Sequence, residues 1–138
     1  MTDGAPRAPA APLVLIVDDN ERNLRLARDV LEYAGIPTIE ARTAATAIAL
    51  AIERQPDLVL MDIRLPDTDG PAALVTLRAD PRTARIPVVA VTSSAMMGDR
   101  ERLLAAGFDG YLEKPISVKE FAGQVRSYVR SSDAGGGG

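Results

Sequence analysis

The chain has 138 residues and a formal net charge of −3, with 46% hydrophobic and 25% charged residues, an ordinary composition for one globular domain. It contains no cysteine and no histidine, which excludes disulfides, thiolate or imidazole metal sites and Ser-His-Asp catalysis. No basic run indicates a nucleic-acid surface, no secretory signal opens the chain, and no apolar run approaches the roughly 20 residues of a membrane helix. We therefore expect a cytoplasmic protein that binds neither nucleic acid nor membrane directly.

The ends of the chain differ in composition from its middle. Residues 1–12 are rich in Ala and Pro without any periodicity, and residues 131–138 end in four glycines. These compositions predict a disordered arm and a flexible tail around one folded domain over residues 13–130.

Strand and helix patterns alternate five times within residues 13–130. Each predicted strand is a short apolar run, and each predicted helix repeats apolar residues at intervals of three and four. In chain order the elements are strand 13–17, helix 24–34, strand 36–41, helix 44–52, strand 57–61, helix 73–77, strand 86–91, helix 97–106, strand 110–112 and helix 118–129. Continuous apolar strands that alternate with helices predict a parallel sheet with helices on both faces and right-handed crossovers.

Polar side chains follow four of the five predicted strands. Asp18 and Asp19 follow the first strand, Asp62 the third, Thr92 the fourth, and Lys114 comes shortly after the fifth. In such folds, ligands bind beyond the carboxyl ends of the strands, so we expect these groups to meet there. Three carboxylates repel one another unless a cation joins them, and clustered hard oxygen ligands suit Mg²⁺. A carboxylate in such a site can attack phosphorus and form an aspartyl phosphate, while an ammonium and a hydroxyl contact the phosphoryl oxygens.

The residues around these positions form motifs that occur in a fixed order. They read VDDN, LVLMDIRLPDTDG, VVAVTSSA and GYLEKPI. With these motifs, residues 13–130 resemble the receiver domain of two-component response regulators, the CheY-like family. The resemblance implies a doubly wound, flavodoxin-like fold of five parallel strands in the order 2-1-3-4-5 with five flanking helices. It also implies that Asp62 is phosphorylated by a sensor histidine kinase or a histidine phosphotransferase.

The resemblance assigns the metal ligands residue by residue. The acidic pair corresponds to Asp18 and Asp19, with Asp19 a direct Mg²⁺ ligand. Asp62 and the backbone carbonyl of Arg64 complete the protein ligands. Arg64 stands where the family usually has a small or neutral residue, but its carbonyl can still bind a metal.

The resemblance also implies a switch. Phosphorylation draws the hydroxyl of Thr92 toward the phosphoryl group, Lys114 contacts that group, and Tyr111 turns inward. The Lys114–Pro115 bond is expected to be cis, which proline permits at low cost. The readout surface would be the fourth helix, fifth strand and fifth helix, which would contact a downstream protein target. The mixed charges of the fourth helix suit a phosphorylation-linked dimer and plain solvation equally.

Several alternatives stay open at this point. The chain could be a single-domain response regulator, a receiver excised from a larger regulator or hybrid kinase, or a receiver-like interaction module that takes no phosphate. In the first two cases it is a signalling switch that catalyses only its own phosphorylation and dephosphorylation. A small Mg²⁺-dependent phosphatase is a further rival, and the segment 67–70 (DTDG) resembles the start of haloacid-dehalogenase phosphatases. That segment does not directly follow a strand, so Asp67 and Asp69 are predicted to be turn residues.

Overall fold

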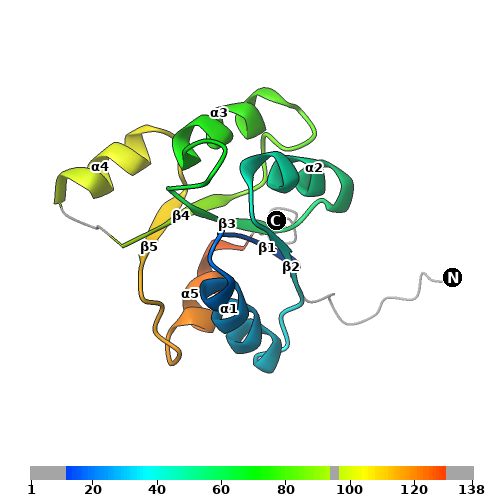
Figure 1. The fold of residues 1–138 in the computed structure, drawn as a ribbon, viewed down its shortest axis with the longest axis vertical. Helices are drawn as coiled ribbons and strands as arrows, with labels where there is room; N and C mark the ends of the chain where they lie inside the picture. The colour runs from blue at the N-terminus through cyan, green and yellow to red at the C-terminus, as the bar shows by residue number, and fades with distance from the viewer. Residues whose placement is uncertain (1–11, 94–96, 130–138) are drawn as a thin grey trace, which may run out of the picture.

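One five-stranded parallel sheet organises the computed structural model, which describes residues 12–93 and 97–129. Its strands lie in the order β2-β1-β3-β4-β5, with helices on both faces (Figure 1). The elements in chain order are β1 Val14–Val17, α1 Glu21–Tyr33, β2 Thr38–Ala41, α2 Ala44–Arg54, β3 Leu58–Asp62, α3 Gly70–Ala79, β4 Val88–Thr92, α4 Met97–Ala105, β5 Gly110–Glu113 and α5 Phe121–Tyr128. The predicted doubly wound fold is therefore confirmed. The predicted arm and tail fall, apart from Pro12, outside the described residues.

The sheet is buried on both faces. Helices α1 and α5 cover one face, and α2, α3 and α4 cover the other (Figure 1). In β1, Leu15 and Val17 pack into the core beneath α2 and α3, whereas Val14 and Ile16 pack into the core beneath α1 and α5. Because successive side chains of a strand point to opposite faces, a strand covered on both sides must be apolar throughout.

Local side chains define where the helices begin and end. The Asn20 side chain accepts hydrogen bonds from the first turn of α1, and the hydroxyl of Thr43 does the same for α2. After α1, Gly35 adopts a φ of +84°, and the N–H of Ile36 donates to the carbonyl of Leu31 at 2.8 Å. This left-handed turn ends the helix with its last carbonyl groups satisfied.

Several predicted boundaries differ from the structure: the third helix spans Gly70–Ala79 and the fourth strand begins at Val88 rather than Ile86, and the last helix and the second strand differ as follows. The last helix was predicted to bury Val118, but α5 begins only at Phe121, residues 118–120 form a turn, and Val118 is 64% exposed. The second strand begins at Thr38 rather than Ile36, because Ile36 closes the turn after α1. Apolar character alone does not distinguish a strand or helix residue from a turn residue, whether that residue is buried, as Ile36 is, or exposed, as Val118 is.

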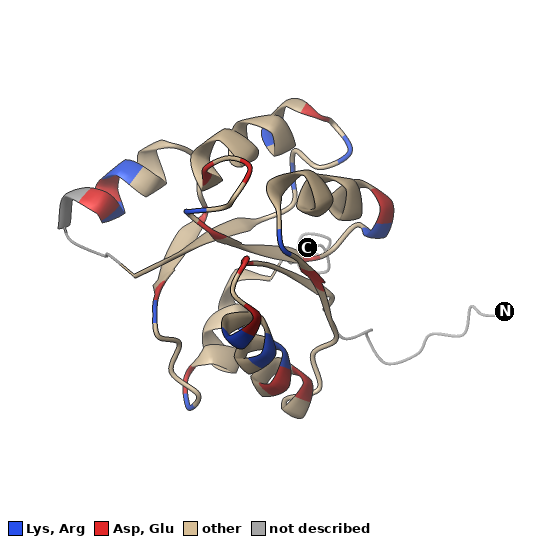
Figure 2. Cartoon of the chain, viewed as in Figure 1, with Lys and Arg blue, Asp and Glu red and all other residues tan. Residues whose placement is uncertain are grey.

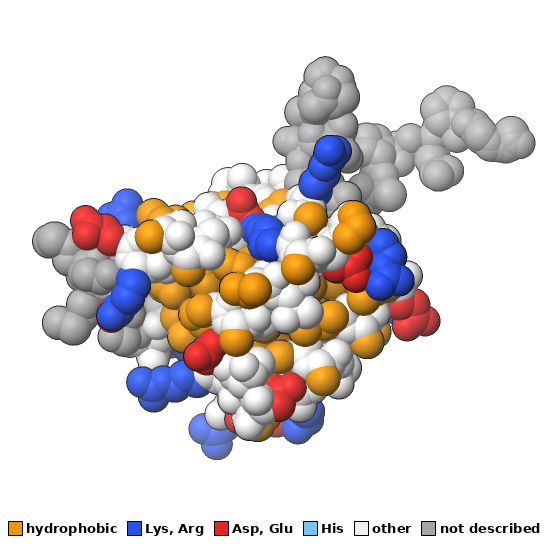
Figure 3. All heavy atoms as spheres, turned by 90° about the horizontal axis from the view of Figure 1, so that it is seen from above, with side chains coloured by type: hydrophobic (Ala, Val, Ile, Leu, Met, Phe, Trp, Pro, Cys, Tyr) orange, Lys and Arg blue, Asp and Glu red, His pale blue; other side chains and the backbone are white. Residues whose placement is uncertain are grey.

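The two helical layers differ in surface character. Helix α1 carries charged side chains along its length, whereas α2 and α3 carry few (Figure 2). Hydrophobic side chains are accordingly visible over much of the face seen from above, where α2, α3 and α4 lie (Figure 3). In the part of the chain that the structure describes, no helix has the length and apolar character needed to cross a membrane.

Candidate functional site

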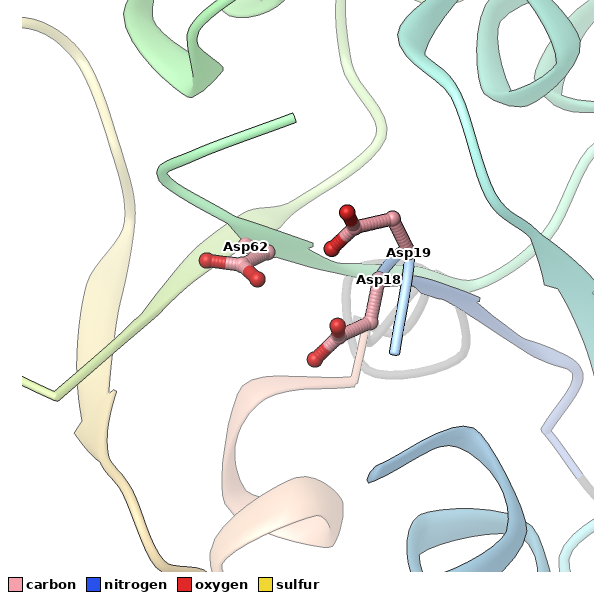
Figure 4. Close-up of side chains that lie close together, drawn as sticks. All are labelled: Asp18, Asp19 and Asp62. Atoms are coloured by element: carbon pink, nitrogen blue, oxygen red, sulfur yellow. The ribbon is translucent and has the colours of Figure 1, made fainter. Parts of the chain in front are cut away.

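Three aspartates meet at the carboxyl edge of the sheet. Asp18 and Asp19 directly follow β1, and Asp62 is the last residue of β3, the strand beside it. One carboxylate oxygen from each of the three lies within 4.8 Å of the others (Figure 4). Asp18 and Asp62 are buried, whereas Asp19 is exposed to solvent. The spacing and the oxygen ligands suit a hard divalent cation such as Mg²⁺.

Lys114 joins two of these carboxylates. Its Nζ lies 2.9 Å from Oδ2 of Asp62 and 3.1 Å from Oδ2 of Asp18. Its backbone N–H donates to the carbonyl of Thr92 at 2.7 Å, so the end of β5 is fixed to the end of β4. The Lys114–Pro115 peptide bond is cis, the conformation that the resemblance implies. One ammonium thus pairs with two of the three carboxylates, which leaves the cluster with more acidic than basic groups.

The surroundings of Asp62 and Lys114 shift the pKa values of both side chains. Burial raises the pKa of Asp62, and the nearby charge of Asp18 adds to this, although hydrogen bonds from Lys114 and the Arg64 N–H partly oppose it. Burial alone would lower the pKa of Lys114, but its hydrogen bonds and charge interactions with Asp62 and Asp18 outweigh this and raise it. Lys114 is therefore a fixed positive charge at neutral pH.

Two asparagines hold Asp18, and the sequence analysis did not assign them to the site. The backbone N–H of Asn20 donates to Oδ1 of Asp18 at 2.9 Å, and Nδ2 of Asn23 donates to Oδ2 at 3.1 Å. Asn23 lies in the first turn of α1, and from the sequence alone an asparagine at this position would be assigned a helix-capping role. An asparagine one helical turn after an acidic pair is the signal that could have indicated it.

Thr92, which ends β4, and an open cleft complete the site. Thr92 is buried at the end of β4, one residue after Val91, which pairs with Asp62 in the sheet. A cleft of about 590 Å³ opens beside them and is also lined by Arg64 and Arg102. Asp99 also lines this cleft and forms a salt bridge with Arg102.

Tyr111 lies in β5, away from the aspartates. Its side chain is half-buried and packs against the core beneath α2, α3 and α4. The guanidinium carbon of Arg100, in α4, lies 5.4 Å from the centre of the Tyr111 ring, which is a cation–π contact. The ring therefore lies between β5 and α4, where a change in its orientation would alter the contact between them.

The loop between β3 and α3 is built from two of the predicted turn residues. Asp69 caps α3 by accepting the N–H of Ala72 at 2.8 Å, as its place before a helix permits. Asp67 instead reaches the start of α2, where its carboxylate accepts the N–H groups of Ala44 and Ala45. These two hydrogen bonds lower the pKa of Asp67. This long-range contact was not predicted, since a turn aspartate gives no sign of a distant partner.

Gly70 is required where this loop returns to β3. A Cβ built on Gly70 would lie 3.0 Å from the backbone oxygen of Asp62 and 3.0 Å from Cα of Ile63. We expect Gly70→Ala to lower the free energy of unfolding by about 2 kcal/mol, because the backbone behind Asp62 must move. Urea denaturation measures this.

The matched control is Gly123→Ala. Gly123 is also helical, but no atom lies within 4 Å of a Cβ built there. This substitution should raise the free energy of unfolding by about 0.5–1 kcal/mol, since alanine favours the helix. Equal effects of the two substitutions would show that the close approach at Gly70 is unimportant.

Comparison with known proteins identifies the family. The family of response regulator receiver domains matches residues 14–126. The chain belongs to this family. The polar-differentiation response regulators DivK of Brucella ovis and Brucella abortus are 46% identical to it over 116 residues, which cover 84% of this chain and 94% of each relative. It is thus a response regulator receiver domain of two-component signalling.

Solved receiver structures share the fold. The chemotaxis response regulator CheY4 of Vibrio cholerae superposes with a TM-score of 0.81 at 21% identity, covering 86% of this chain and 99% of CheY4. The receiver domain of the sensor histidine kinase PA1611 of Pseudomonas aeruginosa superposes with a TM-score of 0.78 at 33% identity, covering 86% and 98%. The PA1611 structure has a magnesium ion coordinated in its active-site cleft. The acidic cluster of the present receiver fits the Mg²⁺ binding that is typical of the family.

Proposed function

We propose that this receiver is a cytoplasmic signalling switch that accepts a phosphoryl group on Asp62, with Mg²⁺, from a phosphohistidine of a histidine kinase or phosphotransferase. The observation that carries the proposal is the contact of Asp62 with Lys114 at 2.9 Å, in a cluster with two further aspartates beside an open cleft. The chain contains no histidine, so the donor imidazole must come from another protein or domain.

The transfer step places the new bond on Asp62. A carboxylate oxygen of Asp62 attacks phosphorus and forms a P–O bond. The P–N bond to the donor imidazole breaks, and its electron pair returns to the ring nitrogen. The side chain changes from a carboxylate to an acyl phosphate, which adds negative charge at the end of β3. Hydrolysis of this acyl phosphate resets the switch.

Lys114 and Thr92 act on the transferred group. The Lys114 ammonium already lies between Asp18 and Asp62, so a phosphoryl oxygen on Asp62 can replace the carboxylate oxygen as its partner. The buried hydroxyl of Thr92, one strand away, can donate to a second phosphoryl oxygen. Both groups stabilise charge that builds up during transfer.

The acidic cluster provides the metal ligands in this proposal. Carboxylates of Asp18, Asp19 and Asp62 and the carbonyl of Arg64 would hold Mg²⁺. The bound ion would neutralise charge on the phosphoryl oxygens. The repulsion between two buried aspartates, only partly compensated by one lysine, favours a further cation in their midst.

The output would be a change in the surface formed by α4, β5 and α5. Movement of Thr92 toward the phosphoryl group leaves space that the half-buried Tyr111 can enter. The Tyr111 ring contacts Arg100 of α4, so its movement would alter the position of this helix. A downstream protein, or a second copy of the receiver, would bind the altered surface.

Mg²⁺-dependent labelling tests the proposal. Acetyl phosphate supplies the phosphoryl group without a kinase, and intact-protein mass spectrometry counts the groups gained. We expect one phosphoryl group per chain with Mg²⁺ and none with EDTA. No gain, with Mg²⁺ binding shown separately and with a kinase donor also inactive, would favour an interaction module that takes no phosphate. Rapid turnover of phosphomonoesters without a phosphoprotein would favour a phosphatase.

A further inference from the structure

The tip of the β3–α3 loop is bonded to a helix elsewhere in the sequence. Oδ1 of Asp67 accepts the N–H of Ala44 at 2.9 Å, and Oδ2 accepts the N–H of Ala45 at 3.0 Å. Both N–H groups belong to the first turn of α2, where no helical carbonyl precedes them as a partner. Each oxygen of the carboxylate thus binds one of two adjacent amides, which fixes the orientation of the side chain.

The loop between Asp62 and α3 is short and internally bonded. Arg64 pairs with Asp69 across its neck as an isolated antiparallel bridge. The N–H of Leu65 donates to the carbonyl of Thr68 at 3.2 Å, and the N–H of Gly70 donates to the carbonyl of Ile63 at 2.7 Å. Because of these bonds, a displacement of the tip moves the neck, which contains Arg64.

The corner between β2 and α2 is in turn bonded to the segment that follows β1. The N–H of Asp18 donates to the carbonyl of Ala41 at 3.0 Å, and Arg42 forms a salt bridge with Glu21 at the start of α1. The corner between β2 and α2 contributes no aspartate to the cluster. It nevertheless links both loops that carry the proposed metal ligands: Ala41 accepts the N–H of Asp18, and the first turn of α2 donates to Asp67.

We propose that Asp67 is a positioning residue for divalent-cation binding: it holds the β3–α3 loop on the first turn of α2 and thereby fixes the Arg64 carbonyl relative to Asp18 and Asp19. This inference rests on the proposed function, since it assumes that the acidic cluster and the Arg64 carbonyl bind Mg²⁺. Loss of the two hydrogen bonds leaves every proposed ligand in the chain but frees the loop that carries one of them.

The competing interpretation is that Asp67 merely caps α2, and the chain offers a control for it. Thr43 caps the same first turn, since its hydroxyl accepts the N–H of Thr46 at 3.1 Å. Thr43 belongs to the β2–α2 corner itself and does not hold the β3–α3 loop. Thr43→Ala and Asp67→Ala therefore both weaken the start of α2, but only Asp67→Ala releases the loop.

The experiment is a Mg²⁺ titration of the full chain by isothermal titration calorimetry, with ¹H–¹⁵N NMR spectra recorded at each step. Relative to wild type, we expect the Kd for Mg²⁺ to rise about tenfold in Asp67→Ala and about threefold in Asp67→Asn, which keeps one acceptor oxygen. Thr43→Ala should keep the wild-type Kd within about twofold, although its melting temperature falls. Without Mg²⁺, the amide signals of Ala44 and Ala45 should move in both Asp67 variants.

The outcomes separate the two proposals. Wild-type chain that binds no Mg²⁺ would overturn the proposed function, and the positioning role would fall with it. Wild-type binding with an unchanged Kd in Asp67→Ala, or with an equal loss in Thr43→Ala, would overturn the positioning role alone. Should Asp67→Ala fail to fold, Asp67→Asn decides, because a wild-type Kd in that variant together with altered Ala44 and Ala45 signals would also overturn it.

Discussion

The Asp62→Asn variant should gain no phosphoryl group from acetyl phosphate and Mg²⁺ under conditions that label wild-type protein fully. An amide oxygen is a far weaker nucleophile than a carboxylate, and the substitution changes little else in shape. Asp62 lies at the end of β3 beside Lys114 and the cleft, so a second acid is not expected to replace it. Intact-protein mass spectrometry on both proteins measures the result.

Asp57→Asn is the matched control, because Asp57 directly precedes the same strand at its opposite end. Its carboxylate accepts the N–H of Leu13 at 2.9 Å, at the end of β1 and β3 opposite to the acidic cluster. This variant should be labelled as fully as wild type. Labelling that persists in Asp62→Asn, or that disappears in Asp57→Asn, would contradict the assignment of the acceptor.

The pH dependence of stability gives an independent test of the surroundings of Asp62. Its folded-state pKa is raised above the ordinary value of 3.8, so the unfolded chain releases this proton at a lower pH than the folded chain. Below 3.8 the side chain is neutral in both states. As the pH rises through the raised folded-state pKa, wild-type protein loses stability that Asp62→Asn keeps. The free energy of unfolding of Asp62→Asn minus that of wild type should therefore increase with pH, as measured by urea denaturation. A decrease would mean that Lys114 outweighs burial at this site.

The order of the elements could be predicted because burial on both faces leaves a strong signal in the strands. Leu15 and Val17 face one layer of helices while Val14 and Ile16 face the other, so the strand has no polar position. The boundaries were less predictable. Ile36 and Val118 are both apolar and were both predicted as the first residue of an element, yet the first closes the turn after α1 and the second lies exposed in a turn.

The aspartates of the candidate site could be predicted from the sequence, but the hydrogen bonds that hold them and their loops in place could not. In a parallel sheet the carboxyl ends of adjacent strands share an edge, which brings Asp18 and Asp62 together whatever their side chains do. The contact of Asn23 with Asp18 depends instead on how the first turn of α1 follows β1, and that of Asp67 with α2 on how two separate segments pack. Asparagine in a first helical turn and aspartate in a turn each have a common local explanation, so the sequence does not distinguish these two from others of their kind.

Replacement of Lys114 by methionine should lower the free energy of unfolding at neutral pH. Methionine keeps most of the apolar stem but removes the ammonium, so Asp18 and Asp62 are left buried with an uncompensated repulsion. Breaking a fully buried ion pair costs roughly 3–5 kcal/mol. The Lys114 side chain is 21% exposed, so we expect a smaller loss in the free energy of unfolding, about 2 kcal/mol in Mg²⁺-free buffer at pH 7. Urea denaturation measures it.

The chain contains one other lysine, Lys119, which is exposed in the turn before α5 and provides the control. Lys119→Met should change the free energy of unfolding by less than about 0.5 kcal/mol. Acidification should restore part of the loss in Lys114→Met, because protonation of Asp62 removes the repulsion. Mg²⁺ should stabilise this variant more than it stabilises wild type, because an added cation replaces the missing charge between the carboxylates. If Lys114→Met and Lys119→Met are equally stable, the ammonium does not offset the repulsion between Asp18 and Asp62, and the electrostatic reason for a cation at this edge of the sheet is lost.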